Sequence, residues 1–214
     1  MNFSYLVSIF GQLSDGLKFT VGLFFVTIIF SVPLGLVLSF IRVGSHKIIQ
    51  RILGGYIWLM RGTPLILQLY FFYYGLSLVT SIQLSRFNAA IVAFILNYAA
   101  YFCEIFRGGL LGVSKGQYEA AKVLGFSTLQ TNVRIVIPQM LRITLPSVAN
   151  EFITLVKDTS LITVLAIDEI LNLAKKIVNT DVNISAYAVV AVYYLIATFL
   201  LTKLFEYLEK KFAY

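Results

Sequence analysis

The sequence predicts an all-α, multi-pass membrane protein with five transmembrane helices, and three observations support that fold class. Of the 214 residues, 59% are hydrophobic and only 13% are charged. The mean hydropathy is +0.86, which indicates more apolar surface than a soluble domain of this length can bury. Finally, Phe19 to Ile41 contains no charged residue, and as a helix it would be about 34 Å long, enough to cross a bilayer.

Residues 1–18 precede this first span as an N-terminal surface segment. The segment contains Asp15 and lacks a basic start, so we do not expect it to be a cleaved signal peptide. Its apolar residues suit a helix that lies on the membrane surface, and a poorly ordered tail is the alternative.

The other four spans are expected over residues 53–79, 87–106, 143–167 and 182–202. The second is predicted to be broken at Arg61-Gly62-Thr63-Pro64, because Thr can cap a helix and Pro can begin one. The fourth is predicted to be interrupted at Lys157-Asp158-Thr159.

The orientation follows from the Lys and Arg residues of the connections. Eleven of them lie in residues 42–51, residues 107–142 and residues 203–214, and four lie on the opposite side. Because basic residues favour cytoplasmic loops, this imbalance places the N-terminus outside and the C-terminus in the cytoplasm. The predicted organisation is a surface segment over 1–18, a transmembrane domain over 19–205 and a cytoplasmic tail over 206–214.

Composition also excludes several classes of function. The net charge of +7 does not predict a nucleic-acid partner, because the basic residues lie singly at span edges. The single cysteine, Cys103, gives no disulfide framework, and no metal site is expected. No Gly-x-x-x-x-Gly-Lys-Ser/Thr phosphate loop is present, so we do not expect this chain to hydrolyse ATP or to be an enzyme.

One polar segment stands out among the apolar spans. Glu119-Ala120-Ala121 is followed after three residues by Gly125, and after nine more by Ile135 and then Pro138. This spacing resembles the EAA loop of the membrane subunits of bacterial ABC importers. Further matches to the polar amino acid permease branch, over about residues 19–205, are Arg61-Gly62-Thr63-Pro64-Leu65 with Gln68, Ala99-Ala100-Tyr101 with Glu104 and Arg107, and Lys157-Asp158-Thr159-Ser160.

The resemblance implies a permease subunit of an ATP-driven importer in the bacterial cytoplasmic membrane. Its substrate would be a polar amino acid of the arginine, lysine, histidine or glutamine type. The implied partners are two copies of an ATP-binding subunit, which would hold ATP and magnesium, a second permease subunit, identical or a close paralogue, and an extracytoplasmic amino acid-binding protein. No cofactor is expected in this chain itself.

The EAA-like segment, about residues 112–138, is the predicted coupling loop. A helix from Lys115 to Leu124 is expected to end at Gly125, since glycine adopts the left-handed conformation without a Cβ penalty. Ala120, Ala121 and Leu124 are expected to form one small face. An ordinary amphipathic surface helix is the alternative. The residues expected to couple to the ATP-binding subunit are Gln117, Glu119, Ala120, Ala121, Leu124, Gly125 and Pro138.

Polar residues inside the spans predict a substrate pathway, because burying them in hydrocarbon is costly unless they face protein or water. In the third span Asn97, Tyr101 and Glu104 share one helical face. The fourth span adds Asn150, Glu151, Thr154, Lys157, Asp158, Thr159 and Ser160. Alternatively, Glu104 pairs with Arg107, and Lys157 with Asp158 or Glu151, only to hold helices together.

Two other classes of function stay open at this point. An ATP-independent channel or ion-coupled carrier is one, and a small membrane enzyme or assembly factor is the other. A carrier should show repeated halves, and an enzyme should show clustered catalytic groups at one membrane face. The sequence shows neither feature.

Overall fold

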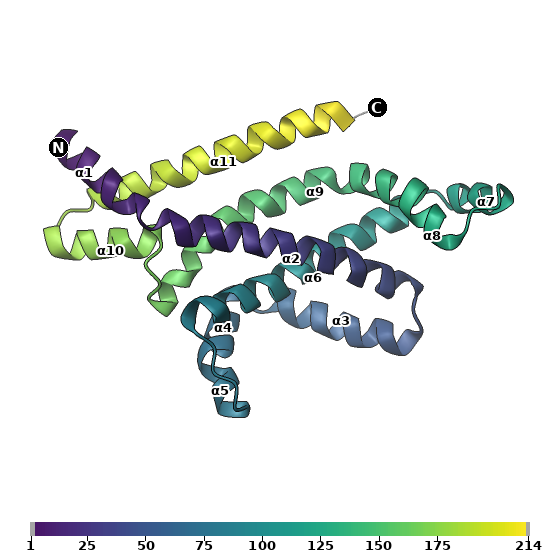
Figure 1. The fold of residues 1–214 in the computed structure, drawn as a ribbon, viewed down its shortest axis with the longest axis horizontal. Helices are drawn as coiled ribbons and strands as arrows, with labels where there is room; N and C mark the ends of the chain where they lie inside the picture. The colour runs from purple at the N-terminus through teal and green to yellow at the C-terminus, as the bar shows by residue number, and fades with distance from the viewer. Residues whose placement is uncertain (1–2, 213–214) are drawn as a thin grey trace.

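The computed structural model describes residues 3–212, which form helices and short connections without any strand. The α-helices are Phe3–Ser14 (α1), Leu17–Gly44 (α2), Lys47–Gly62 (α3), Leu65–Tyr70 (α4), Leu76–Val79 (α5), Arg86–Gly112 (α6), Lys115–Val123 (α7), Thr128–Thr131 (α8), Ile137–Asp158 (α9), Ile170–Asp181 (α10) and Ser185–Phe212 (α11). Phe71–Gly75 and Asn132–Val136 are π-helical, and Thr159–Leu165 is a 3₁₀ helix. The long helices run along the molecule, with α7 and α8 at one end and α1 and α10 at the other (Figure 1).

Three of these helices, α2, α6 and α11, are long and apolar enough to cross a membrane. The pair formed by α3 and Leu65–Val79 qualifies only together, and it bends by 105° at the break. The described residues therefore hold three candidate spans, or four if the bent pair is one span. The predicted fourth span, residues 143–167, covers most of α9 and the 3₁₀ helix after it, and it is less apolar because it carries Glu151, Lys157 and Asp158. The total of five spans stays a prediction.

Two local predictions were wrong. Thr63 does not cap α4; instead its hydroxyl donates a hydrogen bond to the Leu59 carbonyl at 2.8 Å, at the end of α3. The predicted interruption of the fourth span, by contrast, is present, because the α-helix α9 ends at Asp158 and the chain continues as a 3₁₀ helix from Thr159. The last span begins at Ser185 rather than 182, since α10 forms a separate helix before it.

Small and aromatic residues of α6 hold the bundle together. Phe94, Tyr98, Phe102 and Phe106 are four residues apart, so they share one face, and all are buried. Gly35 of α2 lies against this helix so closely that a Cβ there would be 2.6 Å from the Phe102 Cβ. Glycine permits this approach of two helix backbones inside a membrane domain.

A second apolar cluster joins α1 to the opposite end of the bundle. Ile9 and Leu13 of α1 are fully buried, and they pack with Ile170 of α10 and Val189 of α11. Residues 3–14 are therefore helical, while a position of this helix on the membrane surface stays a prediction. The helix lies against protein along this face, because its apolar stripe meets two other apolar helix faces.

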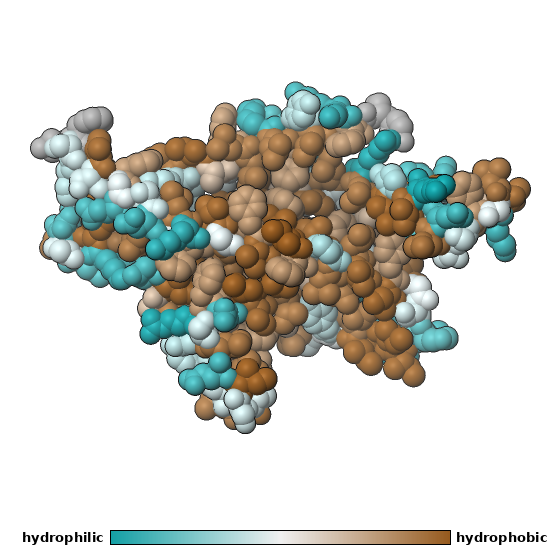
Figure 2. All heavy atoms as spheres, viewed as in Figure 1, coloured by the Kyte–Doolittle hydropathy of each residue, from teal (hydrophilic) through white to brown (hydrophobic). Residues whose placement is uncertain are grey.

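The surface separates into an apolar middle and more polar ends. Figure 2 shows hydrophobic residues across the central helices, with hydrophilic residues gathered over α10 and around α7 and α8. A belt of this kind is expected where lipid covers the middle of a helix bundle. The two polar ends therefore mark the two faces at which water-soluble partners can bind.

Candidate functional site

The amide side chains of two residues stabilise the break between α3 and α4 by hydrogen bonds. Gln68 Nε2 donates to the Met60 carbonyl at 2.9 Å and to Thr63 Oγ1 at 2.9 Å. Asn97 Nδ2, from α6, donates to the same Met60 carbonyl at 2.9 Å and to Gln68 Oε1 at 3.0 Å. These bonds satisfy a carbonyl group that the break removes from the helix.

The break forms one wall of a cavity of about 480 Å³, called the polar cavity below. Its lining comes from four places, namely the break, α6, α9 and the 3₁₀ helix. The lining residues are Arg61, Gly62, Thr63, Pro64, Leu65, Asn97, Tyr98, Tyr101, Glu151, Thr154, Asp158 and Leu161. The four residues predicted as a structural break and five of the predicted pathway residues thus surround one space.

Charges of both signs face the polar cavity. The Arg61 guanidinium lies over the Tyr101 ring, 5.1 Å from its centroid. Asp158 Oδ2 accepts a hydrogen bond from the Tyr98 hydroxyl at 2.7 Å. Glu151 makes no hydrogen bond or salt bridge to any residue that the structure describes. The cavity therefore offers one cation and two carboxylates, and one carboxylate lacks a bonded partner from the chain.

Glu104 does not line the polar cavity, but it contacts Arg61, which does. Its carboxylate bonds to Arg42, lies 2.9 Å from Arg107 and 3.8 Å from the guanidinium of Arg61. The alternative pairing with Arg107 is thus present, together with two further arginines. One carboxylate among three guanidinium groups has little capacity left to bind a substrate cation.

The remaining predicted pathway residues, from α9 and the 3₁₀ helix, lie outside the lining of the polar cavity. Asn150 and Lys157 are exposed, and Lys157 forms no salt bridge within residues 3–212, so its pairing with Asp158 or Glu151 was wrong. Thr159 and Ser160 donate to the carbonyls of Val156 and Lys157, at 2.6 and 2.7 Å. These hydroxyl groups thereby bond locally, at the change from α to 3₁₀ helix.

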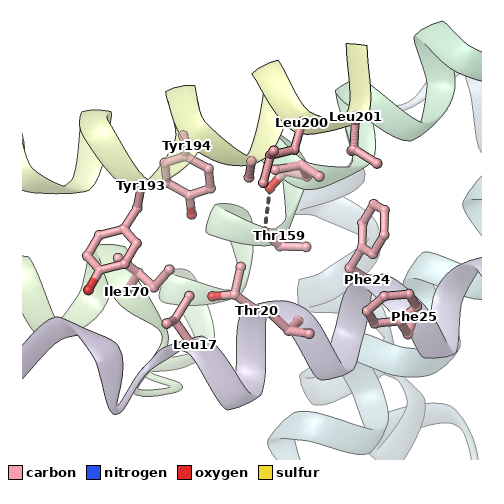
Figure 3. A pocket seen from close by; sticks show the side chains of 13 residues that line it. Leu17, Thr20, Phe24, Phe25, Thr159, Ile170, Tyr193, Tyr194, Leu200 and Leu201 are labelled. Carbon is pink, nitrogen blue, oxygen red and sulfur yellow. Dashed lines mark hydrogen bonds between the residues drawn. The ribbon is translucent and has the colours of Figure 1, made fainter. Parts of the chain in front are cut away.

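Thr159 instead lines an apolar cavity of about 330 Å³ between α2, α10 and α11. Figure 3 shows Phe24 and Phe25 of α2 at one end of this cavity, with Leu200 and Leu201 of α11 above it. No charged side chain is among its lining residues. Its chemistry suits an apolar group and not an amino acid.

The predicted coupling loop forms a short helix and turn at one polar end. α7 ends at Val123, and Gly125 has the expected left-handed conformation with φ +75°. Gln139 of α9 donates a hydrogen bond to Gln117 Oε1 at 3.3 Å, which ties α7 to the bundle. Pro138 lies in the first turn of α9.

The predicted face of α7 was wrong in one respect. Ala121 is fully buried inside the loop, whereas Ala120 and Leu124 are exposed. Adjacent residues point about 100° apart around a helix, so Ala120 and Ala121 cannot share a narrow face. The most exposed apolar residues of the loop are instead Val123, Leu124 and Leu129, which are 87%, 73% and 73% exposed. Val123 and Leu129 were not predicted from the sequence as docking residues. The signal for them was available, because both are large apolar residues in an otherwise polar loop.

At the other polar end, two acidic residues organise α10. The Glu169 carboxylate accepts backbone hydrogen bonds from Leu171 and Asn172 at 2.8 and 2.7 Å, and so caps the helix. Burial raises the pKa of Glu169 to about 7. Asp168 bonds to Lys176 at 2.6 Å, and this partner lowers the pKa of Asp168.

Several known proteins are similar to this chain over most of its length. A family model described as "Binding-protein-dependent transport system inner membrane component" matches residues 31–214. The L-cystine transport system permease protein TcyB of Bacillus subtilis is 34% identical, covering 93% of this chain and 86% of TcyB. The octopine transport system permease protein OccM of Rhizobium radiobacter is 40% identical, over 85% of this chain and 79% of OccM.

Another relative is HisM of Escherichia coli strain K12, a histidine/lysine/arginine/ornithine transport system permease protein. It is 33% identical over 94% of this chain and 89% of HisM. Among solved structures, an amino acid ABC transporter crystallised with histidines has a TM-score of 0.88 at 30% identity, covering 99% of both chains. The MetNI methionine ABC transporter, at 20% identity and a TM-score of 0.74, has the same fold.

Proposed function

The chain belongs to the family of binding-protein-dependent transport system inner membrane components, and from this membership we propose that it is the permease subunit of an ATP-driven amino acid importer. It is a multi-pass protein of the bacterial cytoplasmic membrane, and ATP hydrolysis takes place in a separate subunit. None of the relatives named above is a channel or an ion-coupled carrier, so the ATP-independent alternative has no observation in its favour.

The polar cavity is the proposed substrate site. Arg61 can bind the carboxylate of an amino acid through two parallel hydrogen bonds, since a planar guanidinium matches a carboxylate. Asp158, already bonded to Tyr98, is placed to accept the α-ammonium group. Glu151 is then left for a second cationic group on the substrate. The observation that carries this proposal is the Glu151 carboxylate, which faces the cavity without a bonded partner.

This arrangement favours a basic amino acid over a neutral one. The relatives do not decide the question, because their names specify cystine, octopine and basic amino acids. A neutral substrate would leave the Glu151 carboxylate unpaired at membrane depth, which is costly. Glu104, by contrast, is assigned to positioning Arg61 at the cavity wall and not to contacting the substrate.

Each proposed partner fits a different surface. The exposed apolar residues Val123, Leu124 and Leu129 suit a groove of an ATP-binding subunit, present in two copies and holding ATP and magnesium. The polar face of α10 suits an extracytoplasmic binding protein. A second permease subunit, identical or a close paralogue, suits the arm Leu65–Val79, which turns away by 105° and leaves Leu78 85% exposed.

Transport by the reconstituted importer tests the substrate site. The complex with its ATP-binding subunit and binding protein would be placed in liposomes, and ATP-dependent uptake of arginine and glutamine would be measured. Glu151→Gln removes one charge and keeps the shape, so arginine uptake should fall roughly tenfold to a hundredfold at low substrate while glutamine uptake changes little.

Glu209→Gln in the C-terminal part of α11 is the matched control, since Glu209 is outside the polar cavity, and both uptakes should persist. Equal loss of arginine and glutamine uptake in Glu151→Gln would contradict a role in substrate choice. Uptake that continues without ATP or without the ATP-binding subunit would contradict the importer function itself.

A further inference from the structure

A third cavity, with a different chemistry from the polar cavity, lies between α9 and the end of α11. It has a volume of about 410 Å³, and we call it the α9–α11 cavity. Its walls include Val32 of α2, Phe106 of α6, Leu145 of α9 and Phe212 of α11. Arg142 is the one charged residue among the residues that line it. The proposed substrate site shares none of these residues.

The α9–α11 cavity connects two membrane depths. Arg142 immediately precedes the predicted fourth span, so it lies at the cytoplasmic edge of the membrane. Val32 lies near the middle of α2, a helix long enough to cross the bilayer, and so near the middle of the membrane. The cavity therefore has apolar walls and a cation at its predicted cytoplasmic end, which is the chemistry that suits an amphiphile.

Additional positive charge lies beside the same end. α11 packs along α9, and its last turn carries Lys210 and Lys211 next to Phe212, which lines the cavity (Figure 1). Basic residues just cytoplasmic of membrane helices attract anionic lipid headgroups. A guanidinium has five N–H donors, so Arg142 can bind a phosphate in addition to any partner within the chain.

We propose that the α9–α11 cavity binds an anionic phospholipid of the cytoplasmic leaflet, with one acyl chain along Leu145 and Val32 and the phosphate at Arg142 and the neighbouring lysines. The bound lipid would fill the space between α9 and α11 above the coupling loop. The apolar cavity of Figure 3 provides the contrast, because it has similar walls but no charged lining residue. Lipid there should be held without regard to its headgroup.

The test is photo-crosslinking in the assembled importer. Phosphatidylglycerol and phosphatidylcholine would each carry a diazirine on one acyl chain, and labelled peptides would be mapped by mass spectrometry. Phosphatidylglycerol labelled near its ester should mark the region of Leu141, and label at the chain end should mark the region of Val32. Phosphatidylcholine should label the same peptides several-fold less, while labelling around Leu200 should not depend on the headgroup.

Charge removal then identifies the anchoring groups. Arg142→Gln and Lys211→Gln should each lower phosphatidylglycerol labelling about fivefold, as expected for one interfacial charge. Arg142→Lys keeps the charge and should retain most of the labelling, which separates loss of binding from misfolding. The control Lys47→Gln/Arg51→Gln removes two exposed charges from another predicted cytoplasmic segment and should change nothing.

Two results would overturn the proposal. Equal labelling of the α9 peptide by both lipids would mean that the site is ordinary lipid-exposed surface. Absence of label from the α9 and α2 peptides with either lipid, while the cavity of Figure 3 is labelled, would mean that protein covers the α9–α11 cavity. ATP-driven uptake of amino acids is a separate readout, so neither result bears on the proposed function.

Discussion

Glu104 shows how one side chain can organise a site without lining it. Its carboxylate joins Arg42 of α2, Arg61 of α3 and Arg107 of α6, and so connects three helices. Arg61 also faces the polar cavity. The carboxylate therefore fixes the one cation that is available there for a substrate carboxylate.

Glu104→Gln should destabilise the protein and affect all substrates alike. It leaves three guanidinium groups without their counter-charge in a partly buried place, at an expected cost of about 1–3 kcal/mol in the free energy of unfolding. Thermal unfolding in detergent, together with uptake of arginine and glutamine, measures both effects. Glu206→Gln breaks an exposed pair with Lys203 and should leave stability almost unchanged. An unchanged melting temperature with loss of arginine uptake alone would contradict this role.

Glu169 should make stability depend on pH. Burial raises its pKa from 4.5 to about 7, so the native state holds more protons than the unfolded state between those pH values. The free energy of unfolding should therefore fall as the pH rises through this window, by about 3 kcal/mol at most. Glu169→Gln should flatten the pH dependence of the melting temperature between pH 5 and 7.5.

Asp168→Asn is the control for that measurement. The pKa of Asp168 lies below its ordinary value because of Lys176, so it does not titrate in the window and its removal should preserve the slope. A melting temperature of the Glu169→Gln variant that still falls between pH 5 and 7.5, as in the unmodified protein, would show that another group is responsible.

At the scale of helices, close packing of α2 on α6 depends on Gly35. A Cβ there would lie 2.6 Å from Phe102 Cβ and 3.0 Å from the Ala99 carbonyl oxygen, so Gly35→Ala should force the helices apart at a cost of about 1–3 kcal/mol. Gly22→Ala in the same helix meets nothing within 4 Å and should be neutral or slightly stabilising. Similar melting temperatures for the two variants would contradict this account of the packing.

Substitutions at Gly125, in the turn after α7, can test whether this loop couples transport to ATP hydrolysis. Gly125 has φ +75° and open space around it, so only conformation restricts the residue there. Gly125→Val should cost about 1–3 kcal/mol locally, shift α7 and reduce ATP-driven uptake. Gly125→Asn should keep uptake, because asparagine tolerates the left-handed region. If loaded binding protein stimulated ATP hydrolysis equally in both variants, a coupling role for this turn would be excluded.

At the scale of the whole molecule, the charge imbalance predicts which face is cytoplasmic. Cysteines placed at Ser45 and Gln130 in a Cys103→Ala background should react with a membrane-impermeant thiol reagent in inverted vesicles only. Thr180→Cys, exposed on α10, should react in right-side-out vesicles instead. Labelling of position 45 or 130 from the outside would reverse the assigned orientation.

The sequence by itself determined the helical membrane class, the broken second span and the left-handed Gly125, and its motifs indicated the family. These features are local: apolar run length, a Gly-Thr-Pro break and a glycine at a helix end each act within a few residues. Helical periodicity also placed Asn97, Tyr101, Glu151 and Asp158 on faces that meet at one cavity.

Tertiary structure alone decided which polar groups remain available. Periodicity gives the face of a helix, but not how far it is from the next helix or which distant partner reaches it first. Contacts between residues distant in sequence pair Glu104 with Arg42, orient Asp158 through one hydrogen bond from Tyr98 and leave Glu151 without a bonded partner. Ala121 was buried in the same way, by packing within its own loop. Such competition among partners depends on three-dimensional distance, which one sequence without its fold does not specify.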